Sequence, residues 1–194
     1  FGLEVPATGD SEQDAAAETE REALLKVHEL ATAYFQAQLA GESGVHARAH
    51  LDARAVRPAT AQTLGLGFAP PRRESLKRRL LDAGQSLDLL LRSGLVVERG
   101  GQTIDRFRNR LMIPIWRDAG SVVAFGGRAL ADDQQPKYVN SPETPLYTKG
   151  RTLYGLHMTK QAIRRLGYAV LVEGYFDVAQ ALQAMDPQQV SGAL

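Results

Sequence analysis

The sequence predicts an α/β protein, and three observations lead to that prediction. Apolar residues recur at helical spacing in the first part of the chain, short β-rich apolar runs fill the middle, and a strand, a carboxylate, a glycine and a helix follow one another near the end. The chain has 194 residues, of which 44% are hydrophobic, so it can bury a core and form one domain and part of a second. These numbers exclude a disordered tail.

The first third of the chain is predicted to be helical after a solvated start. Residues 1–18 have the composition of an acidic lead-in or linker, because seven acids and only one base lie in residues 1–22. Over about 20–41 the apolar residues lie on one helical face. Shorter helices are expected over 45–55 and after Pro58, because proline is tolerated in a first helical turn.

The middle of the chain is predicted to alternate helices with short strands. Pro114 cannot donate to a ladder, so its strand lies at an edge or turns that amide position away from a partner. Gly100 and Gly101 mark the turn of a hairpin. The expected elements are a short strand or extended bend over 64–70, helices over 74–83 and 87–91, a hairpin over 96–104, and strands over 111–116 and 121–125.

The end of the chain has the pattern of a βαβ unit. A helix over 152–166 precedes the apolar run 168–172, and a helix over 176–185 leads to a strand that begins at 190. Glu173 follows the first of these strands, at the edge where open α/β sheets place ligands, so it is a candidate for metal or proton chemistry. The alternative is an acid that complements the dipole of the following helix.

Composition excludes several classes of function. The formal net charge is +1, so no global field draws the chain to a polyanion and any basic site must be local. The most basic stretch, 54–79, holds seven bases and one acid, and a solvated helix face is its simpler interpretation. The absence of cysteine excludes disulfides and thiolate metal sites. No run approaches the roughly 20 apolar residues that span a bilayer, and the start lacks Met and a signal pattern, so we expect a piece of a cytoplasmic protein without membrane partners.

Two short motifs have a structural and a functional interpretation. Gly126-Gly127-Arg128 lacks the spacing of a phosphate loop, and the glycines favour a strand bend or the approach of another backbone, with Arg128 projecting. His46 and His50 share a helix face at i and i+4, where a metal ion or a solvated or packed pair would fit. The solvated or packed pair is the simpler interpretation.

A third motif, the irregular segment 136–151, combines positive charges, an aromatic ring and an amide. This mixture suits the backbone and bases of a single-stranded nucleic acid, and a polar loop is the alternative. Its chemistry-bearing residues are Lys137, Tyr138, Asn140, Lys149 and Arg151.

Taken together, these motifs resemble the bacterial replicative, DnaG-type primases. Residues 106–115 are similar to the family's R-F-R-x-R-hydrophobic-F-P-I stretch, with Ile113 where phenylalanine is usual, and residues 172–178 resemble the E-G-Y-x-D-V signature that opens the Toprim fold. Several motifs in one order over residues 65–178 are more specific than any one of them. The segments that follow in the family's order are Gly126-Gly127-Arg128, 137–144, 149–151 and 153–155.

The resemblance implies the N-terminal part of a primase RNA polymerase domain. Residues 19–166 would form an α+β core subdomain with a mixed sheet, and residues 167–194 the truncated start of a Toprim fold. The implied reaction is synthesis of a short RNA primer on a single-stranded DNA template from ribonucleoside triphosphates, with Mg²⁺ or Mn²⁺. An RNA/DNA hybrid is a further partner. A zinc-binding domain would precede this chain, and a domain that binds the replicative helicase would follow it.

The same resemblance assigns roles to individual residues. Glu173 would belong to the catalytic metal site, either as a ligand or as the base for the attacking hydroxyl, and Asp177 is the less favoured ligand. One carboxylate cannot hold the metal ions, so the chain alone is expected to be inactive. The implied nucleic-acid or nucleotide contacts are Arg108, Arg110, Arg128, Lys137, Tyr138, Asn140 and Lys149.

Two other classes of protein fit part of the pattern. A noncatalytic single-stranded DNA-binding module would keep the opening of a degenerate Toprim fold without its metal acids. A topoisomerase or nuclease with a Toprim fold would not need the runs 106–114 and 137–144. An Asp-x-Asp at a strand end beyond Leu194 would separate the catalytic from the noncatalytic class.

Overall fold

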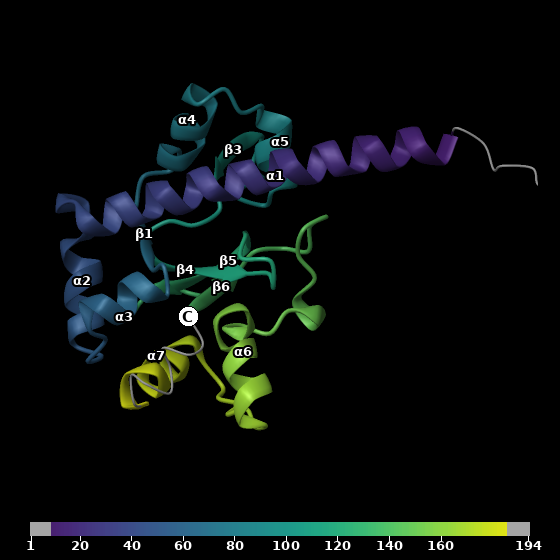
Figure 1. The fold of residues 1–194 in the computed structure, drawn as a ribbon. Helices are drawn as coiled ribbons and strands as arrows, with labels where there is room; N and C mark the ends of the chain where they lie inside the picture. The colour runs from purple at the N-terminus through teal and green to yellow at the C-terminus, as the bar shows by residue number, and fades with distance from the viewer. Residues whose placement is uncertain (1–8, 186–194) are drawn as a thin grey trace, which may run out of the picture.

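A central four-stranded sheet organises the computed structural model, which describes residues 9–185 (Figure 1). The α/β class is confirmed, but every pairing in this sheet is antiparallel, whereas a mixed sheet was expected. The tight turn between the two longest strands, where the Arg117 amide donates to the Ser121 carbonyl at 2.9 Å, returns the chain antiparallel to itself. The strands, in spatial order, are β1 (Gly67–Ala69), β4 (Arg110–Trp116), β5 (Val122–Ala129) and β6 (Tyr138–Asn140).

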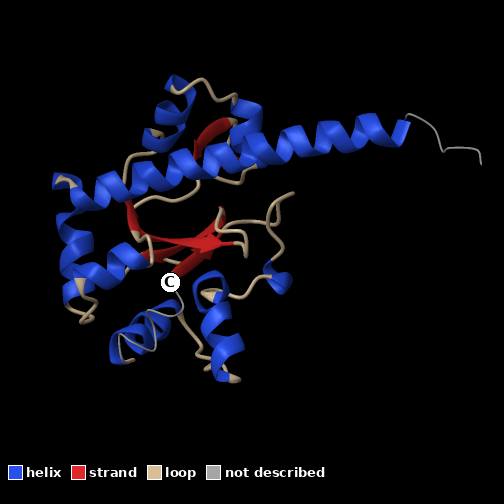
Figure 2. Cartoon of the chain, viewed as in Figure 1, coloured by secondary structure: helices blue, strands red, loops and turns tan. Residues whose placement is uncertain are grey.

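Helices cover both faces of this sheet (Figure 2). The long helix α1 runs across one face, and α6 and α7 lie on the other (Figure 1). Because both faces are covered, β4 and β5 are buried along nearly their whole length, which accounts for their almost continuous apolar sequence. The helices are α1 (Gly9–Ala40), α2 (Val45–Asp52), α3 (Pro58–Thr63), α4 (Ser75–Asp82), α5 (Leu87–Arg92), α6 (Leu156–Leu166) and α7 (Tyr175–Ala184), with 3-10 turns η1 (Glu42–Gly44) and η2 (Lys149–Arg151).

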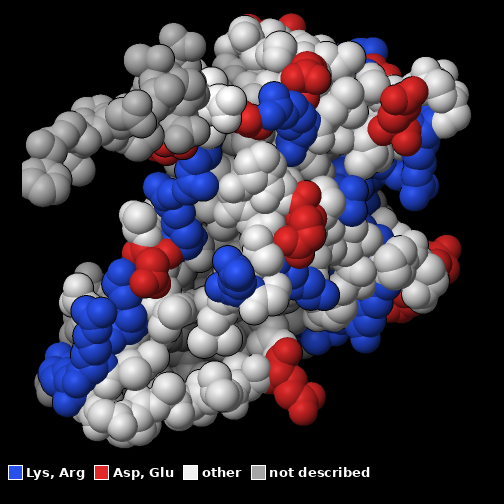
Figure 3. All heavy atoms as spheres, turned by 90° about the vertical axis from the view of Figure 1, so that its right-hand side faces the viewer, with Lys and Arg blue, Asp and Glu red and all other residues white. Residues whose placement is uncertain are grey.

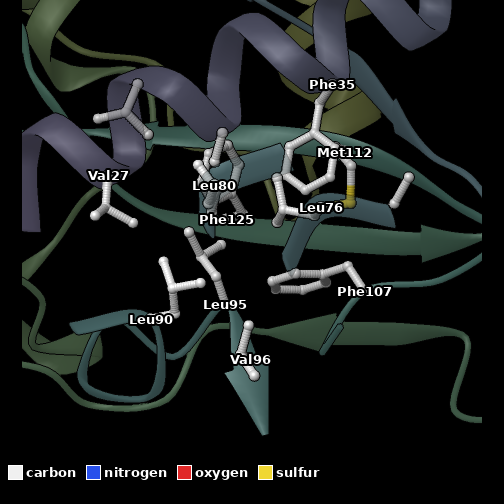
Figure 4. Packing of buried hydrophobic residues seen from close by; sticks show 13 residues of the cluster. Val27, Phe35, Leu76, Leu80, Leu90, Leu95, Val96, Phe107, Met112 and Phe125 are labelled. Atoms are coloured by element: carbon white, nitrogen blue, oxygen red, sulfur yellow. The ribbon is translucent and has the colours of Figure 1, made fainter. Parts of the chain in front are cut away.

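The larger core cluster joins α1 and one face of the sheet to α4, α5 and β2 (Figure 4). Phe125 of β5 is at its centre and meets the ring of Phe35 from α1 edge to face, with 5.3 Å between ring centroids. On β4, Met112 points into this cluster, whereas Leu111 and Ile113 point into a second cluster under α2, α3, α6 and α7. The alternation along one strand therefore anchors a helical layer on each side of the sheet.

Most of the expected elements are confirmed, and one question about Pro114 is settled. The hairpin forms its own two-stranded sheet from β2 (Val96–Arg99) and β3 (Gln102–Asp105). Pro114 lies on a central strand, so the edge alternative is wrong. Its partner on β5 is Phe125, whose amide donates away from β4 to the Ser141 hydroxyl. On the other side of β4, the pairing with β1 reaches only as far as Met112, so β1 does not extend to Pro114. Pro114 therefore turns its nitrogen toward a position that has no strand.

Helix α2 ends at Asp52 rather than 55, and two further helix boundaries differ from the expectation. Helix α1 begins at Gly9, so the part of the acidic lead-in within the described residues is helical, although residues 13–19 are exposed. Alanine and glutamate propagate a helix at little cost once a packed half has nucleated it. Helix α6 begins at Leu156 rather than 152, because Gly155 adopts a left-handed conformation with φ of 81° that a continuing helix excludes.

The expected strand over 168–172 is wrong. This run has irregular backbone in the structure and is exposed, with Leu171 77% exposed. A strand needs a neighbour for its backbone hydrogen bonds, and within residues 9–185 no strand lies beside it. The other strand of the expected βαβ unit, over 190–194, lies outside the described residues. Among the helices of residues 9–185, none combines the length and apolar character required to cross a membrane.

Candidate nucleic-acid and metal site

Two glycines on β5 allow bulky side chains to lie directly on the sheet. A Cβ atom on Gly126 would come within 2.9 Å of the Tyr175 ring, and one on Gly127 within 2.8 Å of the Phe107 ring. The expected close approach is therefore made by aromatic side chains and not by another backbone. Because Tyr175 begins α7, its packing fixes the position of Glu173, two residues earlier, relative to the sheet.

We expect Gly126→Ala to destabilise the chain by about 1 to 3 kcal/mol, the usual cost of an overpacked site. The added methyl group would displace the Tyr175 ring, which urea unfolding monitored by circular dichroism would report as a lower midpoint. Gly150→Ala is the matched control, because a Cβ there meets nothing within 4 Å. Unfolding of Gly126→Ala at the parent's midpoint would contradict the packing described here.

Tyr175 is the centre of an aromatic group between α7 and the sheet. Its hydroxyl donates to Oδ1 of Asn140 at 3.3 Å. Its ring meets Tyr154 edge to face at 4.8 Å and lies 6.3 Å from the ring of Tyr138. Burial, together with the neighbouring Tyr147 and Tyr138, raises the pKa of Tyr175 to about 12, so the hydroxyl stays protonated and remains a donor at neutral pH.

A cavity of about 540 Å³ brings together three of the predicted site residues. Tyr138 and Asn140 of β6 line it from the sheet, and Glu173 lines it from the turn before α7. Within residues 9–185 the exposed carboxylate of Glu173 makes neither an ion pair nor a hydrogen bond. Oδ2 of Asp177, in contrast, accepts from the Gly174 amide at 2.9 Å and caps α7. The helix-end role therefore belongs to Asp177, and Glu173 is available to a ligand.

The donor set around Glu173 fits one ligand of a divalent metal ion. Mg²⁺ prefers oxygen ligands, so an exposed and unpaired carboxylate such as that of Glu173 is a suitable first ligand. Within the described part of the chain, no three His, Cys, Asp or Glu side chains converge on one point. The residues present thus fit one ligand of a metal site and do not complete it.

Arg110 and Arg128, two of the residues expected to contact nucleic acid, are buried beneath β6 and not exposed at the surface. Arg110 is only 4% exposed, and its guanidinium donates to the carbonyls of Gly127, Lys137 and Pro136 at 3.1, 3.3 and 2.8 Å. Arg128 is 5% exposed, and its Nη1 donates to the Tyr138 hydroxyl at 2.5 Å. Both arginines therefore support β6 from below, and their direct contact with nucleic acid stays a prediction.

Lys137 and Tyr138 are exposed at the edge of the sheet, Tyr138 by 39%. Lys149 is also exposed, in the 3-10 turn that leads toward α6, and its backbone amide donates to Oε1 of Glu143 at 3.0 Å. Within residues 9–185, no hydrogen bond or ion pair joins Lys149 to a cavity residue. Its place in the same site therefore also stays a prediction.

Arg106 and Arg108, which precede β4, bring further positive charge near β6. The Nε of Arg106 donates to the Asn140 carbonyl at 3.3 Å, and Arg108 donates to the Asp105 carbonyl. Burial first, and then the positive charge of Arg99, lower the pKa of both Arg106 and Arg108. Such crowding of like charges is relieved by an anion. On the face shown in Figure 3, Lys and Arg gather in separate groups with acids between them, in keeping with a net charge of only +1.

Three residues of this region were not predicted as functional. They are His50 of α2, Arg54 in the turn that follows α2, and Phe176 of α7. His50 and Phe176 contact the guanidinium of Arg128, and Arg54 donates to the same imidazole. Nε2 of His50 accepts from two arginines, so the packed interpretation of the histidine pair holds for His50. The spacing of His50 and Arg54 is an i, i+4 pair, but the partner Arg128 lies 78 residues away and no local pattern predicts it.

An exposed lysine and tyrosine at the edge strand β6, and an unpaired carboxylate that lines the same cavity as β6, are features that an α/β module acting on nucleic acid would use. Residues 34–160 match the family model described as DNA primase catalytic core, N-terminal domain. The chain belongs to this family.

Solved structures and curated sequences agree with this membership. The chain is 42% identical to a DNA primase of Halalkalibacterium halodurans over 85% of its own length and 28% of that protein's. It is similar to the RNA polymerase domain of Mycobacterium tuberculosis primase DnaG in complex with a double-stranded DNA oligomer with an overhang, with a TM-score of 0.80, 38% identity, and coverage of 84% and 51%. It is also similar to a DnaG primase catalytic domain bound to single-stranded DNA, with a TM-score of 0.76 and 33% identity. That match covers 86% of this chain and 52% of the other. These relatives do not favour the noncatalytic module.

Proposed function

We propose that this chain holds the single-stranded DNA template and supplies one metal-binding carboxylate in a primase that makes RNA primers. The observation that carries the proposal is the shared cavity, whose lining includes Glu173, Tyr138 and Asn140. The chain spans about a quarter to a third of the curated primases that it matches. The Toprim assignment of the segment around Glu173 and the activity of the whole enzyme therefore belong to the proposal.

The proposed reaction is a nucleotidyl transfer. The 3′-hydroxyl of the growing primer attacks the α-phosphorus of a ribonucleoside triphosphate, a new O–P bond forms, and the bond to the leaving pyrophosphate breaks. A bound Mg²⁺ or Mn²⁺ would stabilise the charge that develops on the phosphate oxygens. Glu173 would either bind that ion or accept the proton of the hydroxyl. Within residues 9–185 the site offers one such carboxylate, so we propose that the chain synthesises no primer alone.

The template would lie along β6 and the segment that follows it. Tyr138 presents a ring to which a base can stack, and Lys137 and Lys149 are exposed point charges for phosphates. Arg106 and Arg108 add positive charge beside the strand. The residues of 101–151 comprise eight bases and five acids, so we expect modest affinity with a clear salt dependence.

Lys137→Ala and Lys149→Ala test this placement of the template. In a plot of log affinity against log salt, each phosphate neutralised on a single strand contributes a slope of about −0.7. Each substitution should therefore make the slope shallower by somewhat less than about one unit. Tyr138→Ala should weaken binding with little change in slope, because lost stacking releases no counterions. Fluorescence anisotropy of a labelled oligonucleotide over a salt series measures both quantities.

The basic helix α4 provides the control and the competing site. Arg78 is exposed and pairs with Glu74 at 3.6 Å, so Arg78→Ala should leave affinity and slope near the parent's. If binding survives Lys137→Ala and Lys149→Ala unchanged, and is lost on neutralising the α4 region, the template follows α4 and the proposed track is misplaced. The substitutions for that test are Arg72, Arg73, Lys77, Arg78 and Arg79 to alanine.

The remaining partners stay predictions. Ribonucleoside triphosphates, an RNA/DNA hybrid and a replicative helicase are those that a primase of this family would require. A cytoplasmic location and a zinc-binding domain outside this chain are further predictions from the resemblance.

A further inference from the structure

A cluster of four side chains joins α2, β5 and α7 around one imidazole. The Nε groups of Arg54 and Arg128 both donate to Nε2 of His50, each at 3.0 Å. The ring of Phe176 faces both guanidinium groups, at 4.9 Å from Arg54 and 5.2 Å from Arg128. The rings of His50 and Phe176 meet edge to face at 6.3 Å. One neutral acceptor therefore holds two cations against one aromatic ring.

Arg128 depends on this arrangement more than Arg54 does. It is buried, whereas Arg54 is exposed. Within the described residues Arg128 forms no ion pair, and its polar partners are His50 Nε2 and the Tyr138 hydroxyl. Its guanidinium also lies over the Tyr138 ring at 5.2 Å. A buried cation without a counter-ion is held only by the geometry of its neutral partners.

The geometry points to His50 as a positioning residue: its imidazole fixes Arg128, and Arg128 in turn holds Tyr138 for the template and Phe176 at the start of α7. Phe176 is three residues beyond Glu173, so the same imidazole connects the template strand to the turn that carries the candidate metal ligand. The inference rests on the proposed function, in which Tyr138 contacts the template. His50 itself touches neither nucleic acid nor metal in this scheme.

The cluster requires the neutral form of His50. Nε2 accepts two hydrogen bonds, so the ring proton is on Nδ1. Burial, Arg54 and Arg128 lower the pKa of His50, and Asp132, the one acid that acts on it, raises it. Protonation would place a hydrogen between two N–H donors and a third positive charge beside two arginines, which breaks both hydrogen bonds.

The pH dependence of DNA binding separates positioning from charge. An added positive charge beside a phosphate strand strengthens binding, so electrostatics alone predicts tighter binding in acid. The positioning role predicts the opposite, because protonated His50 releases Arg128 and with it Tyr138. We expect the parent's affinity to fall between about pH 7.5 and pH 5 as His50 begins to protonate, toward the roughly tenfold loss of one base-stacking contact that full protonation would give.

The experiment measures anisotropy of a labelled oligo(dT) at constant ionic strength over this pH range. His50→Gln keeps an acceptor that does not titrate, so it should bind like the parent at the upper pH and lose the acid weakening. His50→Leu should bind weakly at every pH. His46→Gln, one turn earlier and exposed, should keep the parent's whole profile. Acid weakening that persists in His50→Gln, or parental binding by His50→Leu throughout, would overturn the inference.

A second measurement needs no DNA and separates this inference from the proposed function. The Nε–H resonance of Arg128 in ¹⁵N-edited NMR spectra should be protected at neutral pH and should be lost as His50 titrates, but persist in His50→Gln. If that resonance is indifferent to His50, the positioning role is wrong even if DNA binds. If the resonance responds but the parent does not bind the oligonucleotide, the cluster is correct and the proposed function fails.

Discussion

Glu173→Gln is expected to abolish primer synthesis, or to reduce it by at least about a hundredfold, the lower range for loss of a general acid–base group. The substitution is nearly isosteric and removes only the charge. The carboxylate has no partner within the described residues, so folding should be unaffected. Template binding should also stay near the parent's, because the phosphate contacts are assigned to Lys137 and Lys149.

The assay requires a chain extended beyond Leu194 to the length of the solved catalytic cores. Synthesis is followed with labelled ribonucleotides on a single-stranded template with Mg²⁺, and the 194-residue chain alone should give no product. Asp88→Asn, an exposed acid on α5, is a matched control that should synthesise normally. Similar rates for Glu173→Gln and the parent would show that Glu173 does not belong to the metal site. Primer synthesis by the 194-residue chain would show that the metal site is complete within it.

Acid is expected to destabilise the fold through His28. This side chain of α1 is fully buried and stacks on Phe125 at 5.9 Å, with Nδ1 donating to the Leu24 carbonyl at 2.8 Å. Burial lowers its pKa from 6.5 to about 4. Between these values the unfolded chain binds a proton that the folded chain does not. Stability that is present above pH 6.5 is therefore lost as the pH falls toward 4, by about 3 kcal/mol.

Urea unfolding of the parent and His28→Phe at neutral and acidic pH measures this loss. The variant keeps a ring on Phe125 and removes the group that titrates, so its free energy of unfolding should fall less in acid, by about the same 3 kcal/mol. The other titrating groups are common to both chains and cancel in the difference. His28→Leu serves if phenylalanine is too large for the space. Equal acid dependence in all three chains would show that His28 is not the responsible group.

The periodic elements of the fold could be predicted because their determinants are local. The apolar face around Val27 and Phe35 predicts α1, and Gly100-Gly101 predicts the hairpin. The start of α1 could not be read from hydrophobic spacing, because the exposed residues 13–19 continue the helix through propensity alone. The apolar run 168–172 shows the converse case, since β-rich composition does not form a strand without a neighbour.

The candidate site could be predicted as a set of residues but not as an arrangement. Glu173, Tyr138 and Asn140 were singled out from the sequence, and the structure places them around one cavity. The burial of Arg110 and Arg128 could not be foreseen, because a basic motif does not show which cations are occupied by carbonyls. The role of Gly126 was also hidden, since the ring that covers it comes from Tyr175, 49 residues further along the chain.

Because the Tyr175 ring packs directly on Gly126, the hydrophobic core can affect the position of Glu173. Phe125, the neighbouring residue on β5, points to the opposite face and anchors the strand under α1. A change of volume at Phe125 that shifts β5 would move Gly126, then Tyr175, and finally the turn that bears Glu173. Substitutions far from any ligand would then lower the rate of primer synthesis before they lower the melting temperature. A random screen for inactive but folded variants would find such substitutions among the core residues that pack against α1.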